Sequence, residues 1–537
     1  MSSPEIKTLD QLLQVRGHQV KNYIILGLSS FLVTSFALTY IVTTSHIKYR
    51  CVIPECEDPR NSSYLTPWLK SAVPYNKDGY PQTCYRYAVR NPGQQGSDMC
   101  NPSYFDSSQV VKCNSWVFES KETNLLNEFN LECDDNKWKL ALIGSLDGFG
   151  ALIGTPVCAF VSDKFGRKRA LCFFSMCCVI LGFIRSFSVN YIMYAVLDFF
   201  NEFLDFGIFG TSFVLCMEVV SSQHRIVGNV IFNLFGSLGY VYLGFAGMWL
   251  SDWRWMLRAL YFSGLIFFSY FWIAPESPRW LMVKNRDVEA VETVKTIIKN
   301  NPKTKHVNVE ELLINTKNLE PGVVIVGYLK TLQLALKSWT LLIRLVHSSI
   351  CWFGVVFLWY GSLQQSVSIS GDKHMNVIFS ALAQVPGYAL SGLSIHVGHK
   401  ITMFGSLLLC SSLSIAFYFL PVEYVTVRLI LFLLSMTGVT SSYAVLYMST
   451  VAMFPTPLRQ SLLAFCSMVG RMGHVLAPQT MQLGSEVTLL IFGCVAFAVA
   501  CLTMFLPETF HLELPDTIKQ AESVGAETTK ANKNTEC

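Results

Sequence analysis

Apolar runs long enough to cross a membrane recur along most of this chain and are separated by short polar turns. A helical span needs about 20 apolar residues. By that criterion the first part of the chain predicts six spans, at 24–44, 139–160, 170–189, 191–217, 227–249 and 256–274. The second part predicts six more, at 340–363, 375–397, 401–420, 425–450, 461–483 and 487–506. The pattern therefore predicts an all-α membrane protein with twelve transmembrane helices in two six-helix halves.

Polar segments set the predicted domain boundaries. We expect a cytoplasmic N-terminus, an N-terminal half that contains an extracellular loop, a cytoplasmic loop, a C-terminal half and a cytoplasmic tail, at 1–23, 24–275 (loop 46–137), 276–338, 339–507 and 508–537. Transporters built from two halves bind cargo near the bilayer midplane and rock one half against the other. The basic turn Asp163–Arg169 marks a cytoplasmic face, because short basic loops are biased to that side.

Composition agrees with lipid as the solvent. Only 15% of the residues are charged, compared with roughly 25% in soluble domains. The formal net charge of +4 is too small to suggest a nucleic-acid partner. No phosphate-binding loop, nucleophile elbow, H-E-x-x-H helix or paired C-x-x-C set occurs. We therefore expect no enzyme activity, no cofactor and no metal site.

The 46–137 segment carries the signature of an oxidising compartment. Six cysteines fall within it, which suggests disulfides, although sequence cannot choose among 15 pairings. Asn61 begins an Asn-Ser-Ser glycosylation sequon in the same segment. Both features predict an extracellular loop held by disulfides; the candidate cysteines are Cys51, Cys56, Cys84, Cys100, Cys113 and Cys133.

A set of ordered motifs links the chain to a known family. They are the turn Asp163–Arg169, the segments 113–116 and 130–133, Trp253–Trp255, Pro275–Leu281, Trp359–Gly361, 454–459, Leu506–Thr509 and 514–518. In this order they resemble the organic cation, carnitine and organic anion transporters of solute carrier family 22, in the major facilitator superfamily. The resemblance implies a major facilitator fold, alternating access for a small organic ion, and a place in the plasma membrane.

The resemblance assigns a gating role to charges at the cytoplasmic span ends. Ion-pair networks there would close the inner side of the outward-facing state, so that opening requires several pairs to break. Some of the basic residues, Lys168 and Arg169 among them, are more simply determinants of topology. The second-half copy of the turn, Ile395–Lys400, is degraded. The gate candidates are Asp163, Arg167, Glu218, Arg225, Glu276, Arg279, Arg459 and Glu508.

The resemblance also implies a cargo pocket made of aromatic and polar side chains from the central spans. Aromatic faces attract organic cations and also bind flat apolar bodies of either charge. Any single aromatic residue in a span is equally well explained by packing. The expected cargo-binding residues are Phe209, Asn233, Trp352, Trp359, Tyr360, Gln384, Tyr443, Tyr447 and Arg471.

Arg471 is the most informative of these residues, because an arginine inside an apolar span is costly and usually functional. In the family that this chain resembles, the organic anion and carnitine transporters have a basic residue at this position, whereas the cation transporters have an acidic one. Arg471 therefore favours a cargo with a carboxylate or sulfate. The alternative is a structural pair with an acid on a neighbouring span. Gln384 stands where the family usually carries glutamate, which removes one attraction for cations.

Acidic residues inside the predicted spans are possible charge or proton sites. Asp198, Glu202 and Asp205 share one helix face, and Asp147 lies in the second span. Intramembrane carboxylates usually face a cavity or an ion pathway, although Asp198 could simply be solvated near a span end. His474, one turn after Arg471, titrates near neutral pH in its ordinary state, and more often such a residue is only hydrogen-bonded. The candidates are Asp147, Glu202, Asp205 and His474.

We therefore predict a transporter of small organic ions, with a zwitterion or a carboxylate-bearing anion as the favoured cargo. Lipid and a coupling ion, sodium or proton, are the expected partners, and the oligomeric state is left open. The second hypothesis is a polyspecific organic cation transporter that uses the acidic residues. A third is a membrane sensor that binds the same cargo without cycling.

Overall fold

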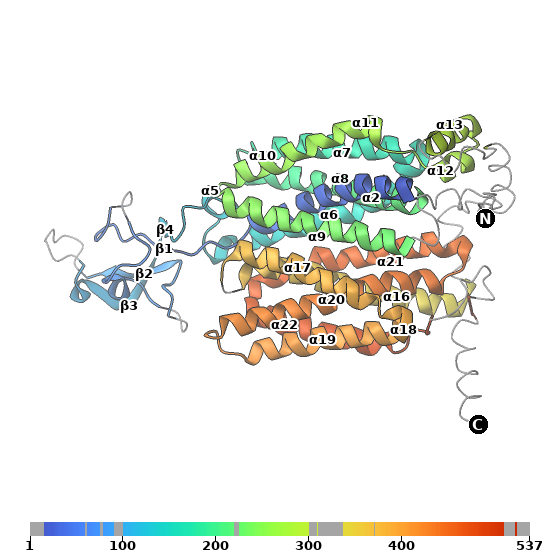
Figure 1. The fold of residues 1–537 in the computed structure, drawn as a ribbon. Coiled ribbons are helices and arrows are strands. Elements are labelled where there is room, and N and C mark those ends of the chain that lie inside the picture. The colour runs from blue at the N-terminus through green and yellow to red at the C-terminus, as the bar shows by residue number, and fades with distance from the viewer. Residues whose placement is uncertain are drawn as a thin grey trace, which may run out of the picture.

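The computed structural model describes residues 16–58, 62–75, 79–90, 100–219, 225–299, 309, 337–369, 371–509 and 521–522. Long helices run side by side in an elongated bundle, and a small domain with short strands extends from one end (Figure 1). We call this end the loop end and the other the opposite end. The predicted glycosylation residue Asn61 and the side chain of Arg225 lie outside the described residues.

Six helical segments form the first half of the bundle. They are α2 (Arg16–Ala37) continued by α3 (Thr39–Thr43), α6 (Asp134–Phe165), α7 (Arg167–Arg185), α8 (Tyr191–Val219), α9 (Arg225–Trp249), and α10 (Trp253–Ser263) continued by η3 (Gly264–Ser269) and α11 (Tyr270–Ile273). Two short helices follow at the opposite end, α12 (Pro278–Val283) and α13 (Asp287–Lys299).

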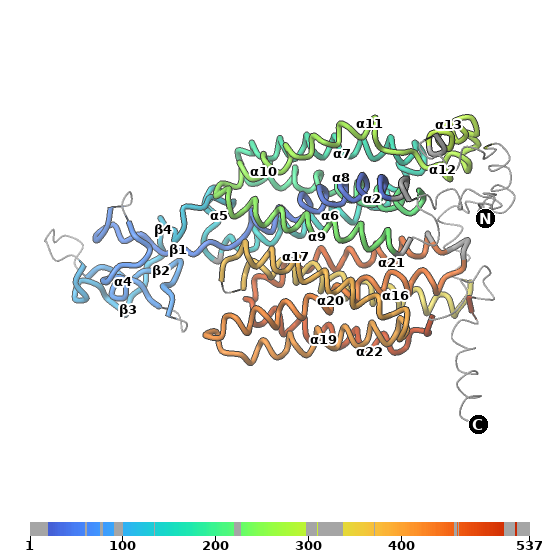
Figure 2. Tube along the Cα trace, viewed as in Figure 1, coloured from blue at the N-terminus to red at the C-terminus, as the bar shows by residue number. Residues whose placement is uncertain are grey.

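Six further helical segments form the second half, which the tube in Figure 2 shows in yellow to red beside the first half. They are α16 (Trp339–Gln365) with η5 (Ser366–Ser368), α17 (Lys373–Ser391) with α18 (Ser394–Val397), α19 (His399–Phe419), α20 (Val425–Met453), α21 (Thr456–Leu476) with η6 (Ala477–Leu483), and α22 (Ser485–Thr503). The predicted twelve helices in two halves are confirmed.

The bundle has the surface of a multi-pass membrane protein. Within the described ranges, nine helices are long and apolar enough to cross a membrane, and α7, α8 and α21 pack among them. Large apolar side chains such as Phe173, Phe262 and Trp272 are 60–70% exposed on the outside of the bundle. Most polar side chains of α8 are instead buried inside it. This inversion is expected where hydrocarbon is the solvent.

The domain at the loop end, which we call the loop domain (residues 45–133), is small and cross-linked. Strand β1 (Tyr49–Cys51) pairs with β4 (Trp116–Phe118), and β2 (Tyr85–Val89) pairs with β3 (Phe105–Lys112), both antiparallel. The structure joins Cys51 to Cys113, Cys56 to Cys100 and Cys84 to Cys133, with Cα atoms 5.7, 5.4 and 5.5 Å apart. The domain also contains the short helices α4 (Leu69–Ala72) and α5 (Leu125–Glu128). Few residues form its core, so the disulfides are expected to carry much of its stability.

Candidate transport site

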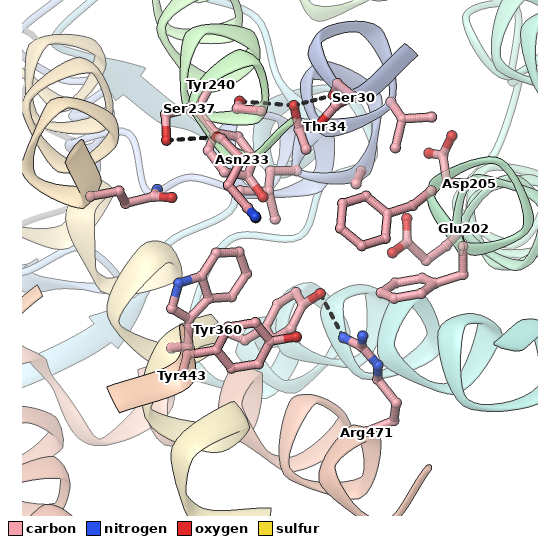
Figure 3. A pocket seen from close by; sticks show the side chains of 18 of the residues that line it. Ser30, Thr34, Glu202, Asp205, Asn233, Ser237, Tyr240, Tyr360, Tyr443 and Arg471 are labelled. Carbon is pink, nitrogen blue, oxygen red and sulfur yellow. Dashed lines mark hydrogen bonds between the residues drawn. The ribbon is translucent and has the colours of Figure 1, made fainter. Parts of the chain in front are cut away.

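A cavity lies between the two halves of the bundle, with an empty volume of about 660 Å³. Helices α2, α8 and α9 line it from the first half, and α16, α17, α20 and α21 line it from the second. Figure 3 shows the side chains that converge on it from both halves. The cavity has the position between two halves at which two-half transporters bind a small organic molecule.

Most of the residues expected to bind cargo line this cavity. Seven do so directly: Phe209, Asn233, Trp359, Tyr360, Gln384, Tyr443 and Arg471. Trp352 and Tyr447 do not, and they form a layer behind it. The Trp352 indole donates to Thr450 Oγ1 at 3.0 Å, and its ring packs against Tyr443 and Tyr447. We therefore expect these two residues to support the wall rather than touch cargo.

Arg471 is buried, with 6% of its surface exposed. Its Nη1 donates to the Tyr360 hydroxyl at 2.9 Å, and its guanidinium lies 4.0 Å from the centre of the Phe206 ring. Among the described residues, no carboxylate lies within ion-pair distance of it. The alternative in which a neighbouring acid neutralises Arg471 is therefore not what the structure shows. Its charge stays available to an anionic group in the cavity.

Two carboxylates face the same cavity from the first half. Glu202 and Asp205 both lie on α8 and are buried, and Figure 3 shows them on the wall opposite Arg471. Asp205 Oδ1 accepts from Cys178 Sγ at 3.0 Å, whereas its Oδ2 makes no hydrogen bond within the described part of the chain. The cavity thus carries charges of opposite sign on opposite halves.

Several buried donors on the cavity wall also have no protein acceptor. Trp359 Nε1, Gln384 Nε2 and Arg471 Nε make no hydrogen bond with any described residue. All three side chains line the cavity and belong to buried residues. Buried polar groups are normally satisfied, so these groups mark a surface suited to a polar ligand.

The expectation that Asp198 could be solvated near a span end is wrong. Asp198 is 1% exposed and forms an ion pair with Arg185 of α7. Arg185 also donates to Thr39 Oγ1 at 2.6 Å and to the Tyr261 hydroxyl at 3.0 Å. This acid therefore holds helices together and does not face the cavity. Its partner Arg185 was missed because an arginine at the end of an apolar run resembles an ordinary interfacial anchor.

Asp147 and His474 lie outside the cavity and meet each other across the two halves. Asp147 Oδ2 of α6 is 3.4 Å from His474 Nε2 of α21, and both side chains are buried. The helix backbones touch here, because a Cβ on Gly148 would lie 2.8 Å from the Val475 nitrogen. The predicted histidine therefore sits at the contact between halves.

The predicted gate residues gather at the opposite end of the first half. Glu276 accepts from the backbone N–H groups of Arg167 and Lys168, at 3.0 and 3.2 Å. The Arg167 side chain pairs with Asp163 and, at 3.2 Å, with Glu218. These contacts join α6, α7, α8 and the start of α12. Within the described part of the chain, the partners in these contacts all belong to the first half, so the network stiffens that half as a unit.

The second half contains an equivalent but simpler turn. Glu508 accepts from the N–H groups of His399 and Lys400, at 3.2 and 3.3 Å. Gly398 joins α18 to α19 with a φ of 103°, as Gly166 joins α6 to α7 with a φ of 107°, a conformation that favours glycine. Arg459, the other predicted gate residue, donates from Nε to the Phe454 carbonyl at 3.2 Å. Arg279 is the second residue of α12.

Sequence reasoning missed several residues of the cavity wall. Tyr240 lies seven residues after Asn233 on α9, and Tyr388 lies four residues after Gln384 on α17. These spacings place each tyrosine on the same helix face as a predicted residue. Helical periodicity could therefore have found them. Phe206, beneath the Arg471 guanidinium, lies four residues after Glu202 and three before Phe209 on α8, so the same periodicity could have found it.

Comparisons with known proteins agree with this arrangement. Residues 132–478 match the sequence family described as the Major Facilitator Superfamily. The chain is 26% identical to organic cation/carnitine transporter 2 of Homo sapiens, over 91% of this chain and 88% of that protein. It is 27% identical to the organic cation transporter protein of Drosophila melanogaster, over 95% and 92%. Solute carrier family 22 member 4 of Mus musculus is 28% identical, over 89% and 87%.

Solved structures with the same fold include the proton:xylose symporter XylE bound to 6-bromo-6-deoxy-D-glucose. That structure superposes with a TM-score of 0.59 at 16% identity and covers 95% of this chain and 99% of its own. A partially occluded inward-open conformation of XylE from E. coli gives a TM-score of 0.58 at 14% identity and covers 92% and 99%.

Proposed function

The chain belongs to the major facilitator superfamily and is a multi-pass membrane transporter of the solute carrier family 22 type that works by alternating access, and we propose that its cargo is a small zwitterion. In this proposal the cargo carboxylate binds Arg471. Its cationic group lies among the aromatic rings and the carboxylates of Glu202 and Asp205. The alternative cargo most similar to this one is an anion that carries a carboxylate and no cationic group.

The observation that carries this proposal is the distribution of charge across the cavity. Arg471 comes from α21 in the second half, whereas Glu202 and Asp205 come from α8 in the first. A cargo with both charges contacts both halves at once. Such a cargo stabilises states in which the halves approach each other around it, which is the differential binding that alternating access requires.

The aromatic wall suits the cationic end of such a cargo. Trp359 and Tyr443 stack with ring centres 5.7 Å apart, and Tyr240 lies 6.3 Å from Trp359. Aromatic faces attract quaternary ammonium groups more strongly where water is excluded. The human relative named organic cation/carnitine transporter 2 supports a cargo of this class.

The second candidate is an organic cation without a carboxylate. The presence of two carboxylates in the cavity, against one arginine, favours it. In that case Glu202 or Asp205 is the main contact and Arg471 contributes little. The two candidates differ in their response to the loss of Arg471, so one experiment separates them.

We would measure uptake of labelled carnitine, tetraethylammonium and para-aminohippurate in cells that express the full chain or Arg471→Ala. We expect carnitine uptake that falls at least roughly tenfold in the variant, the loss expected for a charge-assisted contact. The matched control is Arg428→Ala, another buried arginine of the second half, which pairs with Glu486 at 3.0 Å away from the cavity. Uptake is normalised to surface protein. Entry of tetraethylammonium alone, without carnitine and indifferent to Arg471, would overturn the zwitterion proposal and favour the cation.

We also propose that the protein lies in the plasma membrane with both termini in the cytoplasm. Supporting this, the disulfide-bonded loop domain is at one end, and the basic turn at Arg167 and the start of α2 are at the other (Figure 1). Epitope tags at the two termini would be stained only in permeabilised cells. Accumulation of cargo above its outside concentration in vesicles would rule out a sensor that does not cycle.

A further inference from the structure

Asp147 and His474 form a buried pair that the cargo site does not use. They approach to 3.4 Å across the contact between α6 and α21, and neither Asp147 Oδ2 nor either ring nitrogen of His474 makes a hydrogen bond with a described residue. Asp147 is 2% exposed and His474 is 0% exposed. Two titratable groups from different halves thus face each other without other satisfied partners.

The pair lies near the middle of α6, on the loop-end side of the cavity, where the halves are closed against each other. Next to it, Ser145 Oγ donates to the Val475 carbonyl at 2.7 Å and accepts from Gln479 Nε2 at 2.7 Å. On the other side of the bundle, α9 meets α17, because a Cβ on Gly247 would lie 2.6 Å from His374 Nδ1. Opening the loop end therefore has to separate Asp147 from His474.

The pair is also connected to the cargo site. The Tyr360 ring stacks on His474 with centres 3.5 Å apart, and the same tyrosine accepts from Arg471. Arg471 and His474 lie three residues apart on α21 and so share a face. A carboxylate bound to Arg471 would reduce the positive charge that acts on His474.

We propose that Asp147 and His474 together form a proton site that locks the loop end shut and couples a proton to the carboxylate of the cargo. The coupling part rests on the proposed function, whereas the lock does not. In the closed state the pair is buried, and a lone carboxylate there costs far more than a pair made neutral by one added proton. The pair takes this proton from the outside water as the loop end closes over the cargo. When the cargo leaves on the other side, the full charge of Arg471 acts on His474 again and the proton follows to the inside water. The pair then no longer holds the loop end shut, and one proton has moved in with the cargo.

The surrounding charges favour such a proton. Glu202 and Asp205 of α8 and Arg185 of α7 act on Asp147, and Arg471 acts on His474. Arg185 is already paired with Asp198. The nearby tyrosines, Tyr40 of α3 and Tyr360 of α16, carry no charge when protonated. The three acids, Asp147 itself included, thus face only Arg471 as an arginine outside an ion pair within the described ranges. Adding a proton to the pair reduces this excess of negative charge. A cargo carboxylate on Arg471 strengthens the need for the proton.

The first test reports closure without any cargo. In the full chain in nanodiscs, cysteines replace Ser145 and Gln479, and a bifunctional maleimide cross-links these two cysteines. A protease site is placed in the segment joining the halves, so that after cleavage only cross-linked halves stay together. Loss of a bond across the contact shifts the closed population by roughly threefold to tenfold. We expect the cross-linked fraction to fall by that factor from about pH 5.5 to about pH 8, a range in which histidine titrates.

The same measurement on His474→Gln and Asp147→Asn should lose its pH dependence. The matched control is His347→Gln, because His347 contacts the Leu502 carbonyl at 2.7 Å within the second half and should not alter the response. The lock would be overturned if the pH dependence persists in both His474→Gln and Asp147→Asn. It would also be overturned if only His374→Gln, at the contact between α9 and α17, removes the pH dependence. A flat wild-type response would also overturn it.

The second test addresses coupling in proteoliposomes with labelled carnitine. In wild type we expect an acidic outside to drive accumulation, and His474→Gln should abolish accumulation while carnitine-for-carnitine exchange continues. Accumulation that survives in His474→Gln would overturn coupling. If wild type exchanges no carnitine, the proposed function fails, and the cross-linking result still decides the lock.

Discussion

Glu276 and Glu508 hold equivalent turns at the same end of the two halves. Each accepts hydrogen bonds from two consecutive backbone N–H groups, and in both halves the carboxylate follows its two donors by 109 and 108 residues. Each turn also begins at a glycine with positive φ. The halves therefore repeat one local structure, although the second-half sequence has lost most of its charge.

We expect Arg167→Ala to destabilise the protein more than His399→Ala. Arg167 pairs with Asp163 and Glu218, whereas the corresponding part of the second turn begins with the uncharged Ile395. Losing charge-assisted contacts costs about 1.5–3 kcal/mol. The backbone N–H groups that bind the glutamates survive in both variants.

Thermal unfolding in detergent would check this difference. Lys168→Ala serves as a control, because that residue contributes its backbone N–H to Glu276 and the N–H is retained. Equal losses of stability for Arg167→Ala and His399→Ala would show that the side-chain network adds nothing to the turn.

Breaking the Arg185–Asp198 pair should be among the most damaging single changes in the bundle. Both side chains are at most 2% exposed, so Arg185→Met or Asp198→Leu leaves an uncompensated buried charge, at a cost of about 3–5 kcal/mol. The double variant should recover most of that loss. Thermal unfolding measures all three.

The exposed pair of Arg286 and Glu289 provides the comparison for this experiment. Its side chains are 30% and 49% exposed, and removing such a pair costs about 0–1 kcal/mol. If the Arg185–Asp198 double variant is no more stable than the single variants, the pair is not the source of their defect.

The contact between Glu122 and Lys373 should weaken in acid. Lys373 Nζ lies 2.6 Å from Glu122 Oε1 and so ties the loop domain to the start of α17. Burial raises the pKa of Glu122, but hydrogen bonding from His374 and the charge of Lys373 outweigh it, so the pKa lies below 4.5. A lowered folded-state pKa gives stability that is present above pH 4.5 and is lost as the pH falls through the folded value.

We therefore expect wild type to be more stable than Glu122→Gln at neutral pH, by about 1–3 kcal/mol, and the gap to close below pH 4.5. Thermal unfolding across pH would show this. Glu119→Gln is the control, because its pair with Lys48 is nearly half-exposed on both sides. A gap that is constant with pH would contradict the assignment.

Peptide mapping without reduction should recover three linked pairs from the loop domain, Cys51–Cys113, Cys56–Cys100 and Cys84–Cys133. Replacing Cys51 and Cys113 together by serine should cost about 2–5 kcal/mol and reduce surface expression, because both lie in the small core of the domain. Replacing Cys494 and Cys501, exposed on α22, should change neither. Any other pairing would contradict this fold of the domain.

Much of the fold could be predicted from the sequence, because hydrocarbon imposes a simple rule on spanning helices. Arg471 could be identified for the same reason, since a charge inside an apolar run is rare. The disulfide pairing could not, because spacing does not determine which parts of a folded loop meet. The partner of Asp198 was equally hidden, since periodicity gives the face of a helix but not the side chain opposite it.

The neighbours of Asp147 show the same limit. Nothing in the sequence places it beside His474, more than 300 residues later, because that contact depends on how the two halves close. Trp352 and Tyr447 were expected at the cavity and instead support it from behind. A sequence pattern identifies the aromatic helices but does not separate the first layer of rings from the second.

The tie between the loop domain and α17 gives the protein a site at the loop end where a binder can contact both halves. The domain is covalently part of the first half, yet Glu122 reaches Lys373 of the second half, and Lys373 also donates to Ser45 at 2.9 Å. An antibody fragment that covers this junction would clamp both halves at one angle. It would arrest transport without entering the cavity, and so would inhibit every cargo alike.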